Sequence, residues 1–125
     1  MMLEVMSSYY NKIINKGEIF MNELVTKGIS MNHVELCELI NKLREEEGSR
    51  KQLDKSDLLK KIKKEVKVMK TMGIFNEGNF SLVEYKDKKG EMRPTYLMNR
   101  DGILQMAASE SVYVRAKIIE YINAL

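Results

Sequence analysis

The apolar residues of this chain change their spacing twice, and this change limits the folds that the chain can adopt. Between residues 31 and 73 they recur every three or four positions, which is the period of a helix with one buried face. From residue 80 to residue 98 they fall on every second position, the period of a β-strand. Helical spacing then returns. The sequence therefore predicts a small, mainly helical α+β domain in the order helix, helix, β-hairpin, helix.

The first predicted helix covers residues 31–47. Ser30 is expected to be its N-cap, because a hydroxyl oxygen at that position accepts a hydrogen bond from a free amide of the first turn. Gly48 is expected to end it, since glycine readily adopts the positive φ found after a helix. The expected buried face of this helix consists of Leu36, Leu39, Ile40 and Leu43.

The second predicted helix begins after Asp54, which is the expected N-cap, and ends at Gly73. At 100° per residue its side chains separate into an apolar and a basic face. The apolar face carries Leu58, Leu59, Ile62, Val66 and Met69. The basic face carries Lys60, Lys63, Lys64 and Lys67, with Glu65 toward the apolar side.

A hairpin is predicted around the turn Asp87-Lys88-Lys89-Gly90, where Gly90 supplies a positive φ. Pro94 places its strand at a sheet edge, because proline has no N–H to donate. In the first strand, Phe80 and Leu82 are expected to lie on one face. In the second strand, the residues expected to share a face are Met92, Pro94, Tyr96 and Met98. Asn99 or Asp101 then opens helical sequence, and Ser109 or Ser111 caps a last helix. The buried face of that helix is expected to hold Val114, Ile118, Tyr121, Ile122 and Leu125.

A length of 125 residues, 44% of them hydrophobic and 31% charged, predicts one globular domain. We assign that domain to residues 21–125. Residues 1–20 are a doubtful extension, because Lys16-Gly17-Glu18 can be encoded by a purine-rich ribosome-binding sequence placed two codons before Met21. The alternative for residues 1–20 is an amphipathic N-terminal helix.

The residues that support catalysis or metal binding are few. One cysteine, Cys37, and one histidine, His33, form neither a disulfide nor a zinc cage, and phosphate-loop, dinucleotide and nucleophile-elbow motifs are absent. His33 and Cys37 stand four residues apart on a predicted helix, and we interpret both as structural. We therefore expect that the protein is not an enzyme and that it binds neither a cofactor nor a metal. With no apolar run of about 20 residues and no secretory signal, we expect a cytoplasmic protein without a membrane partner.

The charge is unevenly distributed although the net charge is only +3. Residues 35–47 hold five acidic and two basic side chains, whereas residues 50–70 hold nine basic and three acidic ones. Lysines at helical spacing repel one another, and an anionic partner would relieve that repulsion. A nucleic acid and a merely solvated face both remain open at this point.

Residues 82–102, LVEYKDKKGEMRPTYLMNRDG, contain an aromatic strand, an Asp and Gly turn, a Pro and Tyr strand, and a methionine before Arg-Asp-Gly. This pattern resembles the phage regulatory protein Rha family and related phage antirepressors, and RAKIIEYINAL at residues 115–125 looks like the family's continuation. The positions that carry the resemblance are Tyr85, Asp87, Gly90, Pro94, Tyr96, Met98, Arg100, Asp101 and Gly102. The resemblance implies a phage-borne regulator with a winged-helix-like fold, in which the helical part binds DNA and the hairpin is the wing.

Two functional hypotheses follow. The first is a phage or prophage transcriptional regulator that binds duplex DNA through the basic helix and the hairpin. Its expected nucleic-acid-binding residues are Lys60, Lys61, Lys63, Lys64, Lys67, Lys88, Lys89, Arg93 and Arg100. An ion pair of Arg100 with Asp101 or Glu110 is the structural alternative for that arginine. The second hypothesis is an antirepressor that grips a repressor protein through the acidic first helix or the apolar end around Leu125, without binding DNA. A homodimer is compatible with both.

Overall fold

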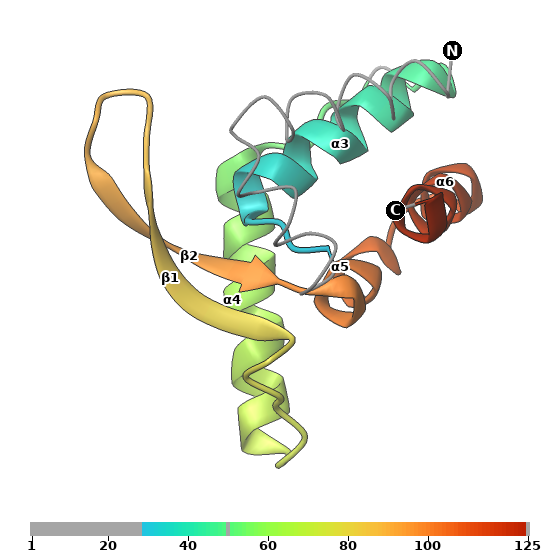
Figure 1. Cartoon of the computed structure of the whole chain (residues 1–125). Coiled ribbons are helices and arrows are strands. Elements are labelled where there is room, and N and C mark those ends of the chain that lie inside the picture. The colour runs from blue at the N-terminus through green and yellow to red at the C-terminus, as the bar shows by residue number, and fades with distance from the viewer. Residues whose placement is uncertain (1–28, 50, 125) are drawn as a thin grey trace.

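A computed structural model describes residues 29–49 and 51–124 of the chain. The doubtful residues 1–20, the expected start at Met21 and the terminal Leu125 lie outside the described residues. The elements are α3 (His33–Glu46), α4 (Lys55–Thr71), β1 (Phe80–Lys86), β2 (Met92–Met98), α5 (Arg100–Ala107) and α6 (Val112–Ala124). The predicted α+β class and element order are confirmed, and the helical stretch after the hairpin is divided into α5 and α6 (Figure 1).

The expected N-cap of the first helix is wrong. Asn32 caps α3: its side chain accepts a hydrogen bond from the Glu35 amide at 3.0 Å, and the Glu35 carboxylate accepts one from the Asn32 amide at 3.1 Å. The helix starts later than expected because Met31 is extended and pairs with Met98, through N–O distances of 2.9 and 2.8 Å. Residue 31 therefore belongs to the sheet side of the fold.

The other helix ends that the sequence predicted lie at the expected residues. Asp54 caps α4 by accepting from the amides of Ser56 and Asp57. Gly48 and Gly73 follow α3 and α4 with φ of 92° and 73°. Of the alternatives left open for the last two helices, Asn99 caps α5 by accepting from the Gly102 amide at 3.0 Å. The Ser111 hydroxyl accepts from the Val114 amide at 3.2 Å, at the start of α6.

The hairpin has the predicted turn and alternation, but the face that is buried changes along its length. The Asp87 carboxylate accepts from the amides of Lys89 and Glu91, both at 2.9 Å, and Gly90 has φ of 83°. Phe80 and Met98, which are paired, are buried at the base of the hairpin. Leu82 is nevertheless exposed, whereas Thr95, on the opposite face, is buried. The period of two holds, but the hairpin twists away from the core so that different faces are covered at its base and along its length.

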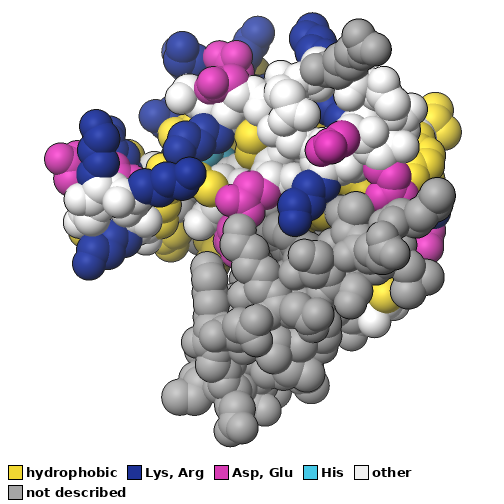
Figure 2. Space-filling model, turned by 90° about the horizontal axis from the view of Figure 1, so that it is seen from above, with side chains coloured by type: hydrophobic (Ala, Val, Ile, Leu, Met, Phe, Trp, Pro, Cys, Tyr) yellow, Lys and Arg dark blue, Asp and Glu magenta, His cyan; other side chains and the backbone are white. Residues whose placement is uncertain are grey.

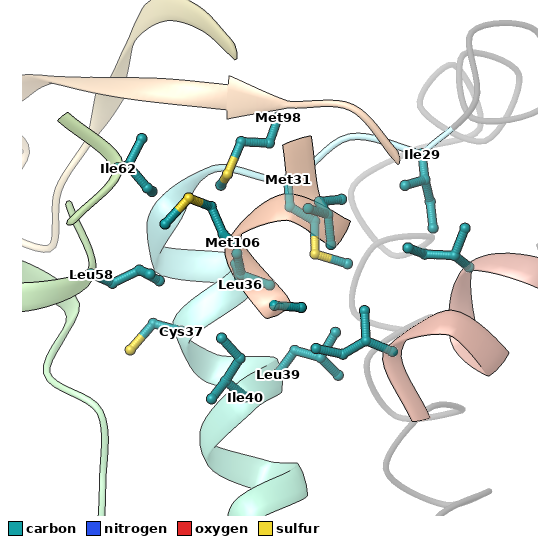
Figure 3. Packing of buried hydrophobic residues seen from close by; sticks show 14 of the residues in the cluster. Ile29, Met31, Leu36, Cys37, Leu39, Ile40, Leu58, Ile62, Met98 and Met106 are labelled. Carbon is teal, nitrogen blue, oxygen red and sulfur yellow. The ribbon is translucent and has the colours of Figure 1, made fainter. Parts of the chain in front are cut away.

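The core lies between α3 and the elements around it. Helix α3 packs against both α4 and α6, and β2 contacts α3 and α5. Figure 3 shows Met31, Met98 and Met106 meeting Leu36 beside two of the residues that α4 contributes, Leu58 and Ile62. The predicted apolar faces of α3, α4 and α6 are buried in this cluster, except for Leu59, which is half-buried, and Leu125, which lies outside the described residues. In the described part of the chain, no helix has the length and apolarity to cross a membrane.

Gly102, on the first turn of α5, packs against the backbone that leads into β1. A Cβ atom at this position would lie 2.3 Å from the Asn79 carbonyl oxygen and 3.0 Å from Met98 Cβ. The same two segments are joined by hydrogen bonds from Asn99 to Asn79. Glycine at this position therefore allows α5 to approach the base of the hairpin.

We predict that Gly102→Ala destabilises the protein. Overpacking costs about 1–3 kcal/mol, and because the obstacle is a backbone carbonyl we expect the upper part of that range, about 2–3 kcal/mol. Helix propensity returns roughly 1 kcal/mol of this. Urea unfolding should show a net loss of about 1–2 kcal/mol for Gly102→Ala. The neighbouring exposed residue provides the control: Asp101→Ala should change stability by about 0.5 kcal/mol or less. Unchanged stability of Gly102→Ala would show that α5 and the Asn79 backbone lie farther apart than in this structure.

Candidate nucleic-acid interface

Helix α4 presents a row of lysines to solvent. Lys60, Lys63, Lys64 and Lys67 are exposed, while Leu58, Ile62, Val66 and Met69 on the other side are buried. Glu65 is turned toward α5, where its carboxylate accepts a hydrogen bond from Gln105 Nε2 at 3.1 Å. The remaining acids of this region, Asp54 and Asp57, lie at the start of the helix. The exposed middle of α4 therefore carries positive charge without acidic neighbours on the same face.

The hairpin and α4, with His33 of α3, line an open cavity of about 580 Å³, which we call the basic hollow. Its cationic lining comes from both elements and consists of Lys55, Lys60, Lys63, Lys88, Lys89 and Arg93. Figure 2 shows Lys and Arg side chains on the projecting hairpin tip and around the hollow next to it. Asp87 is the acidic residue in this lining. The fold thus brings together cations that are about 30 residues apart in the sequence.

Some of the charged side chains at the hairpin tip form ion pairs with one another. Arg93 Nε lies 2.6 Å from Asp87 Oδ2, and Arg93 Nη2 lies 3.0 Å from Glu91 Oε2. The Arg93 guanidinium, followed by hydrogen bonds from the backbone, holds the pKa of Asp87 below its usual value. Arg93 therefore orders the turn as well as lining the hollow. Lys88 and Lys89 at the same tip are exposed.

The structure separates some predicted site residues from the hollow. Lys64 and Lys67 lie on the exposed face of α4 but outside its lining. Lys61 is on another flank of the helix, where its Nζ donates to Ser109 Oγ. Arg100 begins α5 and donates to Asn123 Oδ1 at 3.5 Å. Of the two ion pairs considered as the structural alternative for Arg100, with Asp101 or with Glu110, the second is wrong, because Glu110 binds Arg44 through two N–O distances of 2.8 Å.

One cationic lining residue, Lys55, was missed by the sequence analysis. It stands at the first position of α4, before the lysine row that the helical spacing singled out. Only the position of the hairpin beside this end of α4 brings Lys55 into the hollow, so no local pattern identifies it.

A family model for the phage regulatory protein Rha matches residues 50–125. The chain belongs to the phage regulatory protein Rha family. No curated protein and no solved structure gave a match. The matched residues include α4, the hairpin, α5 and α6, so the cationic lining of the basic hollow belongs to the part shared with the Rha family, whereas α3 precedes that part. The Rha resemblance found in residues 82–102 is thereby confirmed and extends upstream into α4.

At the bottom of the hollow, this Rha-family protein places a buried histidine. His33 is 3% exposed, its Nδ1 lies 2.7 Å from Thr95 Oγ1, and its ring meets the Tyr85 ring edge-on at 5.3 Å. Both partners belong to the hairpin. Cys37, one helical turn further along α3, instead donates to the Leu53 carbonyl at 3.2 Å. The two residues therefore have separate structural partners, and His33 joins α3 to the hairpin.

The surroundings of His33 oppose its protonation. Burial lowers the pKa of the imidazole below its ordinary value, and the positive charges of Lys55 and Lys63 lower it further. The neutral ring is therefore the form that suits the folded protein. Protonation would add another positive charge beneath a surface that already carries lysines.

We predict that stability falls as the pH drops below about 6.5, the ordinary histidine pKa. In that range the unfolded chain binds a proton at His33 that the folded chain resists, so acid favours unfolding, with a slope of at most about 1.4 kcal/mol per pH unit. Above about pH 7 both states carry a neutral ring, and this contribution disappears.

The matched variant is His33→Asn, which keeps a polar group toward Thr95 but does not titrate. Urea unfolding of both proteins between about pH 7.5 and 5.5 avoids most carboxylate titration. The wild type should lose more stability over this range than His33→Asn. Parallel pH profiles would contradict the assignment of His33 as a buried neutral group.

Proposed function

We propose that this Rha-family protein is a phage or prophage transcriptional regulator that binds duplex DNA through the basic hollow and the exposed face of α4. The observation that carries the proposal is the convergence of six cationic side chains from two elements on one concave surface. A duplex offers closely spaced phosphates that such a surface attracts, and release of condensed counterions supplies much of the affinity. Lysines act mainly on phosphates, so α4 positions the protein on the duplex.

The order of the elements supports a winged-helix arrangement. An extended residue that pairs with the hairpin, Met31, precedes two packed helices, α3 and α4, and the hairpin follows. In helix-turn-helix proteins the second helix enters the major groove, which is the place that α4 would take, with the hairpin beside it as the wing. The connection between α3 and α4 covers residues 47–54 and is longer than the 3–4-residue turn of the simplest such motif.

The antirepressor alternative relies on the acidic side of α3 or on the apolar end around Leu125, which lies outside the described residues. Several of the acids of α3 already have structural roles. Glu35 completes the capping box of α3. Glu46 accepts from the Tyr113 hydroxyl, and Glu47 accepts from the Ser111 hydroxyl, both at 2.8 Å. These contacts join the end of α3 to the start of α6, and they leave fewer acids free for a partner than the sequence suggested. This observation favours DNA as the partner.

We predict that the double variant Lys60→Gln/Lys63→Gln weakens DNA binding mainly through its salt dependence. Each phosphate contact contributes roughly 0.9 to the slope of log affinity against log salt, so the slope should fall by roughly 1.8. The loss should be similar on operator and random DNA. Stability should change by about 0.5 kcal/mol or less per residue, since both side chains are exposed. Binding is measured by fluorescence anisotropy across a salt series.

The control is Lys42→Gln/Arg100→Gln, which removes the same charge from exposed positions on α3 and α5, outside the hollow. Its slope should equal that of the wild type. Equal slopes for the wild type and the Lys60/Lys63 variant, or no binding by the wild type at low salt, would remove the DNA proposal and favour the antirepressor.

A further inference from the structure

Helix α6 is apolar on two faces, and only one of them contacts the core. Val114, Ile118, Tyr121 and Ile122 form the buried face. On the opposite side, Val112 and Ile119 are 73% and 45% exposed. Together with exposed Ala116 and Asn123 they form what we call the outer stripe of α6. At 100° per residue these four positions fall within about 60° of the helix circumference. A helix on the surface of a monomer normally has a polar outer face, so the outer stripe requires an explanation.

The spacing of the outer stripe is that of a coiled coil. Its residues follow one another at intervals of four, three and four, which places Val112 and Ile119 at heptad position d, and Ala116 and Asn123 at position a. Such a seam pairs with the same seam of another helix. A single asparagine at position a is a common device that fixes the register of a pair at some cost in stability.

The charges beside the outer stripe select the partner and its direction. In this heptad assignment Arg115 is at position g and Glu120 at position e, on opposite flanks of the seam. Within the helix, Glu120 also pairs with Lys117 at 3.3 Å, and both side chains of this pair reach solvent. When two such helices run parallel, position g of one lies beside the e position five residues further along the other, so Arg115 meets Glu120 twice across a twofold axis. An antiparallel pair would place Arg115 beside Arg115 and Glu120 beside Glu120. The flanking charges therefore complement a parallel second copy of this chain.

We infer that two copies of the protein associate in parallel through the outer stripes of α6. This inference goes beyond DNA binding and does not depend on it. The opposite face of α6 packs against α3 and α5. Among the described residues the outer stripe is exposed, although Asn123 Oδ1 accepts a hydrogen bond from Arg100 at 3.5 Å. In Figure 1 α6 lies at the end of the molecule away from the hairpin. Both basic hollows would stay accessible on the dimer, related by a twofold axis. With only 13 residues in α6, the dimer is expected to be weak and to depend on concentration.

Charge reversal tests the pairing directly by sedimentation equilibrium of the full chain without DNA. Arg115→Glu alone, or Glu120→Arg alone, creates two like-charge contacts in its homodimer, and each should raise the dimer dissociation constant by roughly tenfold or more. An equimolar mixture of the two variants should recover wild-type affinity, because each contact in the mixed dimer again joins opposite charges. Lys42→Glu, an exposed charge reversal on α3, should leave association unchanged.

Two further variants test the seam and its direction. Ile119→Glu should abolish dimerisation while the thermal unfolding curve stays close to that of the wild type. Asn123→Cys should form a disulfide between copies under mild oxidation, because equivalent residues face each other only when the helices are parallel, and Lys42→Cys should not. A monomeric wild type, an Arg115→Glu variant that dimerises like the wild type, or no gain on mixing would overturn the inference. A monomeric wild type would indicate that the outer stripe binds a different protein.

Discussion

Two backbone hydrogen bonds between Met31 and Met98, at 2.9 and 2.8 Å, connect the segment before α3 to the end of β2. Both residues are fully buried, and a buried peptide group that loses its partner costs about 1–3 kcal/mol. This pairing determines where the hairpin leaves the helical core. His33, at the start of α3, then contacts Thr95 in the same strand. The hairpin is consequently fixed beside the first half of α4, and the basic hollow depends on this placement.

The basic hollow concentrates like charge, and such a surface reduces the stability of the compact state. The acids near the hollow are directed away from its lysines, although Asp87 neutralises Arg93, one of the six cations. Glu65 is directed to Gln105 on α5, and Asp87 is occupied by Arg93 and by the amides of its own turn. The lysines thus remain available to an anionic partner. The same arrangement explains why a neutral His33 belongs beneath them.

Features that depend on neighbours a few positions away could be predicted from the sequence. Asp54 as a cap, the glycines that end α3 and α4, and the turn at Gly90 depend on local hydrogen bonds and backbone geometry. Ser30 failed as a cap because the pairing of Met31 with Met98, 67 residues away, extended the chain there. A local pattern carries no information about such a partner.

The residues of the candidate site also divide into those set by local spacing, which could be predicted, and those set by tertiary packing, which could not. Helical spacing identified the lysine row on α4, since one helix determines which of its side chains share a face. It could not place Lys61 against Ser109, Arg100 against Asn123, or Lys55 within the hollow, because each of these depends on how α4, α5, α6 and the hairpin pack. The contact of His33 with Thr95 likewise joins residues 62 positions apart.

The most direct test of the DNA-binding account is to follow the backbone amide chemical shifts of the protein by NMR while duplex DNA is added at low salt. The account predicts that the perturbed amides gather on α4 between Lys55 and Lys67 and on the hairpin between Lys86 and Arg93. Perturbations confined to the acidic end of α3 or to the outer stripe of α6, or a spectrum that DNA leaves unchanged, would contradict it.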